Sequence, residues 1–200
     1  MKHIALCTPC YTEHVHLYWM SCYVRTHDMF TDLGIKLDFC CVSGCGVIQV
    51  ARNELVTLAL ETDATHILFI DGQQLWQPEG LQRMLRDLDK YPAVAAPVAN
   101  RAGKFAAKYT GEEDGFLKKA EHSAIAFLGV RRDVLEKMKE AYMQELSYKN
   151  EKSGNIDVGL FEPMIENKKY IGEDLAFTKR LTRIGIPLWV DEAIKVVRLK

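Results

Sequence analysis

The sequence predicts an α/β protein folded as a three-layer α/β/α sandwich around a mainly parallel sheet. In the first half of the 200 residues, short apolar runs alternate with amphipathic segments, and the links between them are short. This order is typical of parallel strands joined by crossover helices. One run, HILFI at 66–70, is apolar almost throughout. We therefore expect it to be a strand buried on both faces near the middle of the sheet.

Each element of the first half follows from its apolar spacing and its boundary residues. Positions 35–41 alternate apolar and charged residues, as half-buried strands do. Thr12 is expected to cap the first helix and Gly34 to end it, and Pro78 suits the first turn of the third helix. The elements are, in order, a strand at 3–7, a helix at 13–33, a strand at 35–41, a helix at 47–61, the strand at 66–70, a helix from Pro78 and a strand at 93–98.

The second half of the chain is less regular. Residues 100–122 mix basic and acidic side chains, which favours a loop or an irregular hairpin, and 147–169 is polar and loop-like. The regular elements expected here are a strand at 123–130, a helix at 132–146, a helix at 173–184 and one or two strands within 187–197.

Composition and charge limit the class of protein. A hydrophobic fraction of 48% and a charged fraction of 26% are those of a soluble globular protein. The net charge of −1 provides no general attraction to nucleic acid or to an anionic membrane. No apolar run approaches the roughly 20 residues that span a bilayer, and the N-terminus lacks the pattern of a secretory signal. We expect a cytoplasmic protein.

All six cysteines lie within the first 45 residues. Cys7 and Cys10 have the spacing of a zinc knuckle or a redox pair, and Cys41 with Cys45 would complete a four-thiolate site. The second pair lacks the two-residue spacing of a zinc ribbon, however, and Cys7 and Cys41 lie in apolar runs. Reduced, mostly buried thiols are therefore the preferred interpretation.

A ligand site is expected where the parallel strands end. The segments 8–11, 43–46, 71–74 and 97–101 follow predicted strands, so they should meet at one edge of the sheet. They supply polar groups, glycines and the carboxylate of Asp71, as a small-ligand site requires. The alternative for Asp71-Gly72 is an ordinary turn.

Five segments together resemble a known family. TPCY (8–11), VARNELV (50–56), ILFIDGQQLWQPEGLQRML (67–85), IAFLGVRRDVLEKM (125–138) and IGEDLAFTKRLTRIGIPLWVDEAI (171–194) cover most of the chain. In this order they resemble small nucleotide-sugar glycosyltransferases of the GT-A fold, which are common as stand-alone domains in bacteriophage and other viral genomes. The resemblance implies one domain over 1–200, with a nucleotide-binding half at 1–100 and an acceptor-side half at 101–200. If the source is viral, the compartment would be the host cytoplasm.

The resemblance also implies which residues hold the donor. Thr8, Pro9 and Tyr11 would line the nucleotide pocket, and the guanidinium of Arg52 would meet a phosphate. Asp71 matches the first acid of the family's Asp-x-Asp motif, which contacts the ribose and the sugar of the donor.

Glu173 and Asp174 match the acidic pair at the start of the family's late helix. Asp174 would be the general base that takes the proton of the acceptor hydroxyl. The alternative is structural, since acids in a first helical turn favour the helix dipole.

The metal ligands of the family are not matched. Gln73 occupies the position of the second acid, and 196–199 lacks the histidine that commonly follows the final strand. A neutral amide is a poor ligand for Mg²⁺ or Mn²⁺, although Asp71, the diphosphate and water remain an alternative way of holding the ion. Basic side chains would otherwise neutralise the leaving group; the candidates are Arg52, Arg101, Lys104, Lys108, Arg198 and Lys200.

The resemblance predicts an enzyme that moves a sugar from a UDP-, GDP- or dTDP-sugar to an unknown acceptor, with inversion at the anomeric carbon. One alternative is a catalytically silent module that binds a nucleotide or a glycan. A dinucleotide-dependent oxidoreductase is less well supported, because no Gly-x-Gly-x-x-Gly follows the first strand.

Overall fold

The computed structural model describes residues 2–99, 105 and 107–199, and its centre is an eight-stranded mixed sheet. The strand order is β2-β1-β3-β8-β5-β13-β7-β6. β1, β2, β3, β5 and β13 run in one direction, while β8 and β7 oppose it. The bounds are β1 (His3–Cys10), β2 (Lys36–Ser43), β3 (His66–Ile70), β5 (Ala93–Ala95), β6 (Ala107–Asp114), β7 (Leu117–Ser123), β8 (Phe127–Arg131) and β13 (Leu188–Asp191).

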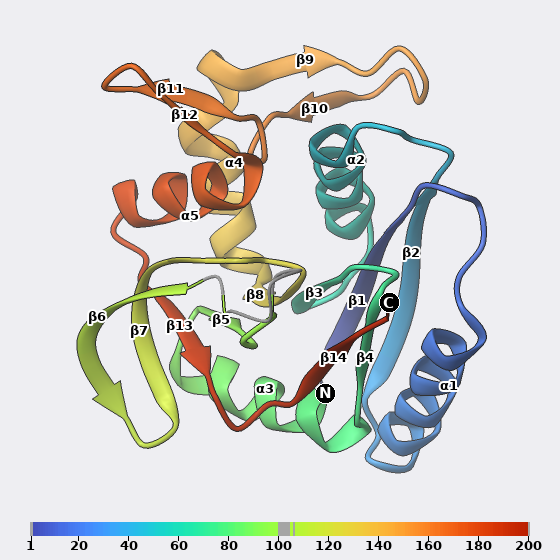
Figure 1. Ribbon diagram of the computed structural model, residues 1–200. Helices are drawn as coiled ribbons and strands as arrows, with labels where there is room; N and C mark the ends of the chain where they lie inside the picture. Colours follow the sequence, from blue (N-terminus) through green and yellow to red (C-terminus); the bar gives the residue numbers. More distant parts are fainter. Residues whose placement is uncertain (1, 100–104, 106, 200) are drawn as a thin grey trace.

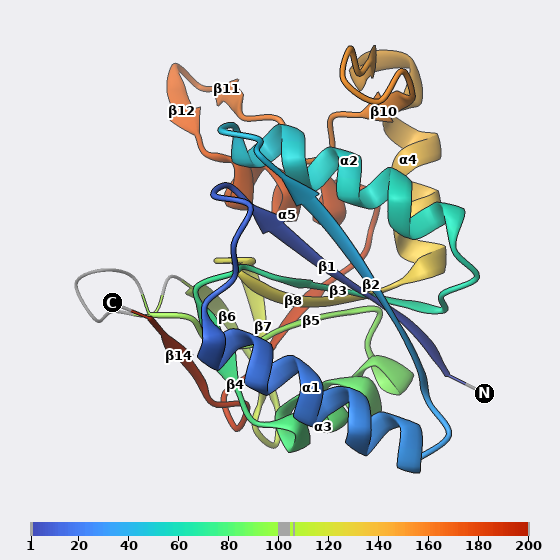
Figure 2. The same ribbon diagram turned by 90° about the vertical axis from the view of Figure 1, so that its right-hand side faces the viewer.

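Helices cover both faces of the sheet, so the predicted three-layer architecture is confirmed (Figures 1 and 2). One layer contains α1 (Leu17–Asp32) and α3 (Pro78–Lys90), and the other contains α2 (Ile48–Glu61), α4 (Arg132–Leu146) and α5 (Glu173–Arg183). Each layer buries its own apolar core against the sheet. No described helix is long and apolar enough to cross a membrane.

The strand predicted at 66–70 is β3, and every residue in it is buried. It lies between β1 and β8, with Ile67 opposite Ala5 on one side and Val130 on the other. On one face Phe69 meets Phe161 edge to face at 5.5 Å between ring centroids. A side chain of this size fits because both faces of β3 are covered by helices.

The start of the first helix was predicted wrongly. α1 begins at Leu17 rather than at 13, and its N-cap is His16, whose Nδ1 accepts a hydrogen bond from the Tyr18 amide at 3.2 Å. The Thr12 hydroxyl instead donates to the His14 carbonyl at 3.3 Å, and Glu13 has a positive φ of 60°. These local bonds hold 11–16 as a loop.

Some predicted loops contain short strands. β4 (Gln74–Trp76) pairs antiparallel with β14 (Val196–Arg198), although 71–78 was expected to be a loop. Within 147–169, β9 (Ser147–Lys149) pairs with β10 (Ile156–Val158), and β11 (Met164–Glu166) with β12 (Lys169–Ile171). The strand predicted at 123–130 begins only at Phe127, because 123 closes β7. β6 and β7 form the irregular hairpin that was expected, with shifts of register.

The six cysteines are unpaired, but they are less buried than predicted. Cys7, Cys10 and Cys22 are buried, whereas Cys41 is exposed. β2 is an edge strand, so the pattern that suggested a buried strand leaves this side chain open to solvent.

Candidate active site

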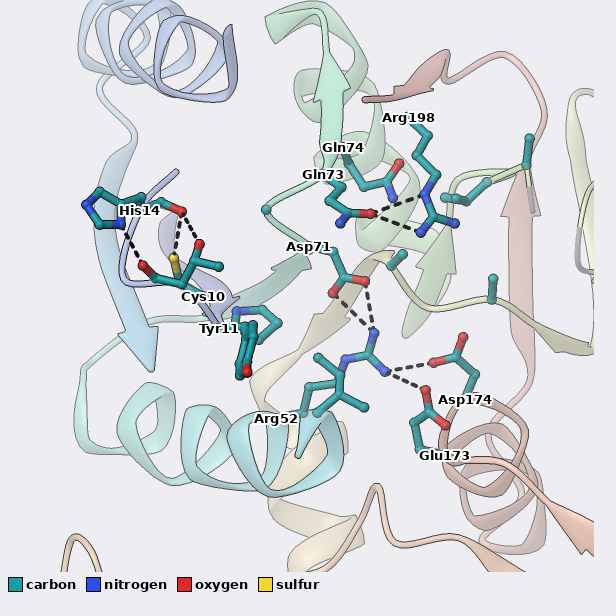
Figure 3. Close-up of a pocket in the computed structure, with 18 residues that line it drawn as sticks. Cys10, Tyr11, His14, Arg52, Asp71, Gln73, Gln74, Glu173, Asp174 and Arg198 are labelled. Carbon is teal, nitrogen blue, oxygen red and sulfur yellow. Dashed lines mark hydrogen bonds and ion pairs between the residues drawn. The ribbon is translucent and has the colours of Figure 1, made fainter. Parts of the chain in front are cut away.

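A cavity of about 520 Å³ opens at the edge of the sheet where β1, β3 and β5 end. It is lined by Pro9, Cys10, Tyr11, Thr12, His14, Ile48, Arg52, Asp71, Gly72, Gln73, Gln74, Val98, Ala99, Ala124, Ala126, Glu173, Asp174 and Arg198 (Figure 3). Three of the four predicted segments, 8–11, 71–74 and 97–101, therefore contribute to the cavity. The fourth, 43–46, follows the edge strand β2 and does not line it.

Arg52 connects the acidic residues of the cavity. Its Nη2 donates to both carboxylate oxygens of Asp71 at 3.1 and 3.2 Å, and its Nη1 donates to Asp174 Oδ1 at 2.7 Å. Glu173 Oε1 lies 3.8 Å from Nη1. The structure thus brings together four of the predicted site residues, from the α2, β3 and α5 segments of the chain (Figure 3).

The Arg52 side chain is only 3% exposed. Its Cζ lies 5.7 Å from the centre of the Phe161 ring, which adds a cation–π contact on the buried side. The next residue, Asn53, fixes the segment that carries this ring, because its Oδ1 accepts a hydrogen bond from the Phe161 amide at 3.0 Å. The guanidinium is therefore held in place before any ligand arrives.

The cluster carries an excess of negative charge. Three carboxylates face one guanidinium, which gives a formal net charge of −2. Burial raises the pKa of Asp174, and Glu173 and Asp71 add to this, while Arg52 opposes it. Burial alone would lower the pKa of Arg52, but Asp71 and Asp174 raise it overall, so this residue keeps its positive charge.

Asp174 is both anchored and accessible. Besides the bond from Arg52, its Oδ2 accepts a hydrogen bond from the Ile125 amide at 3.4 Å, while its side chain remains 34% exposed. Ile125 lies just before β8, which runs against its neighbours, so the amino end of this strand meets the carboxyl ends of the others. This reversal also explains why Ala124 and Ala126 line the cavity.

A second polar group lies on the other side of Asp71, where the C-terminal strand crosses. Gln73 Oε1 accepts hydrogen bonds from Arg198 Nη2 at 2.9 Å and from Nε at 3.3 Å. The backbone fixes the same contact, because the Leu199 amide donates to the Gln73 carbonyl at 2.8 Å. Gln74 is only 2% exposed, and its Oε1 has no partner among the described residues.

The segment that follows β1 forms a further wall. Tyr11 is 71% exposed and lies against Gly46, where an added Cβ would stand 3.3 Å from the Tyr11 ring. Cys10 Sγ donates to the His14 carbonyl at 3.1 Å. Thr8 is placed differently from Pro9 and Tyr11: it is fully buried and is not on the cavity wall.

Sequence reasoning missed several wall residues. His14 was assigned to a helix that starts only at Leu17, and Ala124 and Ala126 were assigned to a strand that begins at Phe127. Gln74 lies in the segment 71–74, which was expected to reach the ligand site, and this position was the only sequence signal that it would line the cavity. Nothing local to His14 indicated that it would line a cavity.

The candidate cations are distributed unevenly. Lys108 lies on β6, and its ammonium nitrogen is 2.7 Å from a carboxylate oxygen of Glu121. It does not line the cavity. Arg101, Lys104 and Lys200 are outside the described residues. Within the described part of the chain, no three His, Cys, Asp or Glu side chains are grouped so as to hold a metal ion.

Comparison with known proteins supports the fold. No protein-family model and no curated protein sequence matches this chain. A197 from STIV is similar to it with a TM-score of 0.67 and 14% identity, over 100% of this chain and 86% of A197. GalNAc-T7, in a crystal structure with UDP, GalNAc and Mn²⁺, is similar with a TM-score of 0.60 and 9% identity, over 100% of this chain and 44% of that one. The predicted GT-A-like fold is confirmed.

Proposed function

We propose that this protein is a nucleotide-sugar glycosyltransferase in which Asp174 is the general base. The observation that carries the proposal is the Asp71–Arg52–Asp174 arrangement. One guanidinium holds two carboxylates, one directly after β3 and one in α5, on the wall of a single cavity in a GT-A-like fold. The structure with UDP and GalNAc has this fold, which makes UDP-sugars the first donors to test.

The proposed reaction is a single displacement. The oxygen of an acceptor hydroxyl forms a bond to the anomeric carbon of the sugar while the bond from that carbon to the diphosphate oxygen breaks. The electron pair of the broken bond leaves with the nucleoside diphosphate, and the hydroxyl proton passes to Asp174. Attack from the face opposite the leaving group inverts the anomeric centre.

The surroundings of Asp174 suit this role. A raised pKa makes its carboxylate a stronger base than that of an ordinary aspartate. Arg52 and the Ile125 amide fix its orientation, and its exposed part can meet a hydroxyl. Asp71 and Glu173 are then available to accept hydrogen bonds from sugar or ribose hydroxyls.

The test combines binding and turnover. A panel of nucleotide-sugars is screened by thermal shift, since a ligand at a hundred times its Kd stabilises the folded state by about 2.7 kcal/mol. Hydrolysis or transfer of the donors that bind is then measured for the wild type and for Asp174→Asn. The loss of a general base lowers kcat by about 10²–10⁴-fold, with nucleotide affinity unchanged.

The matched control is Asp133→Asn, which removes an acid from the first turn of α4. This side chain is exposed and pairs with Arg131, so turnover should stay at the wild-type level. If nucleotide-sugars bind but none is turned over by the wild type, the silent binding module is the correct interpretation.

A further inference from the structure

Arg198 differs from Arg52 in how much of its charge is available. Both of its hydrogen bonds within the described residues go to the neutral amide oxygen of Gln73, and no described carboxylate lies within ion-pair distance. A guanidinium has five N–H groups, so three of them have no partner among the described residues. Arg198 is exposed at the cavity wall.

Arg52, by contrast, is already committed. It is buried, it contacts three carboxylates, and the cluster around it is negative overall. A phosphate placed against Arg52 would also approach Asp71, Glu173 and Asp174. Repulsion from these acids would offset the attraction of the single guanidinium.

The structure holds Arg198 in a defined place. In the β4–β14 pair it lies opposite Gln74, directly after the Asp71-Gly72-Gln73 segment. The Gln73 side chain receives two of its N–H groups, which restrains the plane of the guanidinium. In Figure 3, Asp71 lies between this pair and Arg52.

We infer that Arg198, aimed by Gln73, is the residue of the cavity that binds a diphosphate group. Planar, always-charged guanidinium groups recognise phosphate through paired N–H donors. The cavity is then polarised: the anionic part of a ligand lies at the β14 side, and its hydroxyl-bearing part lies at the Arg52 cluster. This inference rests on the proposed function for the identity of the whole ligand, but not for the diphosphate contact itself.

The probe is inorganic pyrophosphate, titrated calorimetrically into the full chain in the presence of EDTA. Arg198→Gln should weaken its binding about tenfold or more, because a charge-assisted hydrogen bond is lost. Gln73→Glu should weaken pyrophosphate binding as well. The new side chain has nearly the same shape as glutamine, but its carboxylate neutralises the charge of Arg198. The matched control is Lys195→Gln, which removes the same charge just before β14. Lys195 is exposed, and among the described residues its ammonium group donates only to the Glu192 carbonyl.

Three results would overturn the inference. The first is the absence of pyrophosphate binding to the wild type. The second is equal affinity of the wild type and Arg198→Gln. The third is pyrophosphate binding that requires Mn²⁺ and has the same affinity with or without the Arg198 side chain. Circular dichroism of each variant shows that a loss of binding is not a loss of folding.

The inference and the proposed function fail separately. If Arg198→Gln weakens pyrophosphate binding while no nucleotide-sugar is turned over, the diphosphate site stands and the glycosyltransferase proposal falls. If donor turnover depends on Asp174 while Arg198→Gln binds pyrophosphate like the wild type, the reverse holds.

Discussion

At the scale of single residues, Arg52 stabilises a cluster of three carboxylates that would otherwise repel one another. Asp71 and the adjacent acids Glu173 and Asp174 come from two segments far apart in the sequence, and their carboxylates meet around one buried guanidinium. Without this positive charge, three like charges would share a partly buried space. The residue is therefore expected to matter for stability as well as for ligand binding.

We predict that Arg52→Ala lowers the free energy of unfolding by about 2–3 kcal/mol near pH 8. The expected loss is smaller than that for removing one partner of a wholly buried ion pair, because the three carboxylates are a quarter to a third exposed. Arg52 opposes the rise in the pKa of Asp174, so without Arg52 this pKa rises further in the folded variant, and lowering the pH to about 5 should recover part of the loss. Urea unfolding at both pH values measures the effect.

The control for this prediction is Arg183→Ala. Arg183 is exposed and pairs with Glu166 at 2.7 Å on the surface, so its loss should cost less than about 1 kcal/mol at either pH. Equal effects of the two substitutions would show that the Arg52 cluster stabilises the fold no more than a surface pair does.

At the scale of elements, two acids lie next to each other where α3 meets β13: Asp87 on the helix and Asp191 on the strand. Asp191 is fully buried and accepts hydrogen bonds from Arg83 Nε and from the Ala193 amide. Burial and the neighbouring Asp191 carboxylate together raise the pKa of Asp87 to about 7, against the opposing effect of Arg83. Asp87 Oδ2 is buried and has no partner among the described residues.

The sign of the pH dependence follows from this pKa. The folded state holds a proton on Asp87 between about pH 4 and pH 7 that the unfolded chain has already lost, so stability falls as the pH rises through that window. We predict that Asp87→Asn, which keeps an N–H donor toward Asp191 at every pH, is more stable than the wild type by about 1–2 kcal/mol near pH 8.5.

Thermal unfolding across the pH range tests this. Near pH 5 the two proteins should melt at similar temperatures, because the wild type then carries the proton itself. A constant difference at all pH values would mean that Asp87 does not titrate in this range.

At the scale of the whole molecule, the positive charge of the cavity is supplied by arginines. The Arg52 cluster already has a cation between its carboxylates, and Gln73 binds Arg198 in the position where the resembled family has a second acid. A hard divalent ion prefers carboxylate oxygens to an amide.

We predict that the affinity for a nucleoside diphosphate changes less than about tenfold between EDTA and saturating Mn²⁺. Gln73→Asp, which places a second carboxylate beside Asp71, should introduce a dependence on Mn²⁺. Calorimetric titration of nucleotide with and without the metal gives both values. A strong requirement for Mn²⁺ in the unmodified protein, lost in Asp71→Asn, would show that Asp71 holds the ion without a second acid.

The sequence by itself determined the features that depend on local pattern. The run at 66–70 specifies β3 through its nearly unbroken apolar character. Gly34 and Gly185 end α1 and α5 with the positive φ that glycine adopts readily. The residues after β1, β3 and β5 reach one cavity because parallel strands end at one edge. The apolar periodicity and the direction of a strand depend only on short stretches of sequence, so both can be predicted from the sequence alone.

Only the tertiary structure decided which of these residues meet. The Arg52–Asp174 bond joins positions 122 residues apart, and the Arg198–Gln73 bond joins positions 125 residues apart. β8 runs against its neighbours, and β14 adds to β4, which the local pattern of neither strand specifies. Such pairings depend on free energies summed over the whole fold. No local signal therefore reveals that Arg52 pairs with acids while Arg198 has no acidic partner among the described residues.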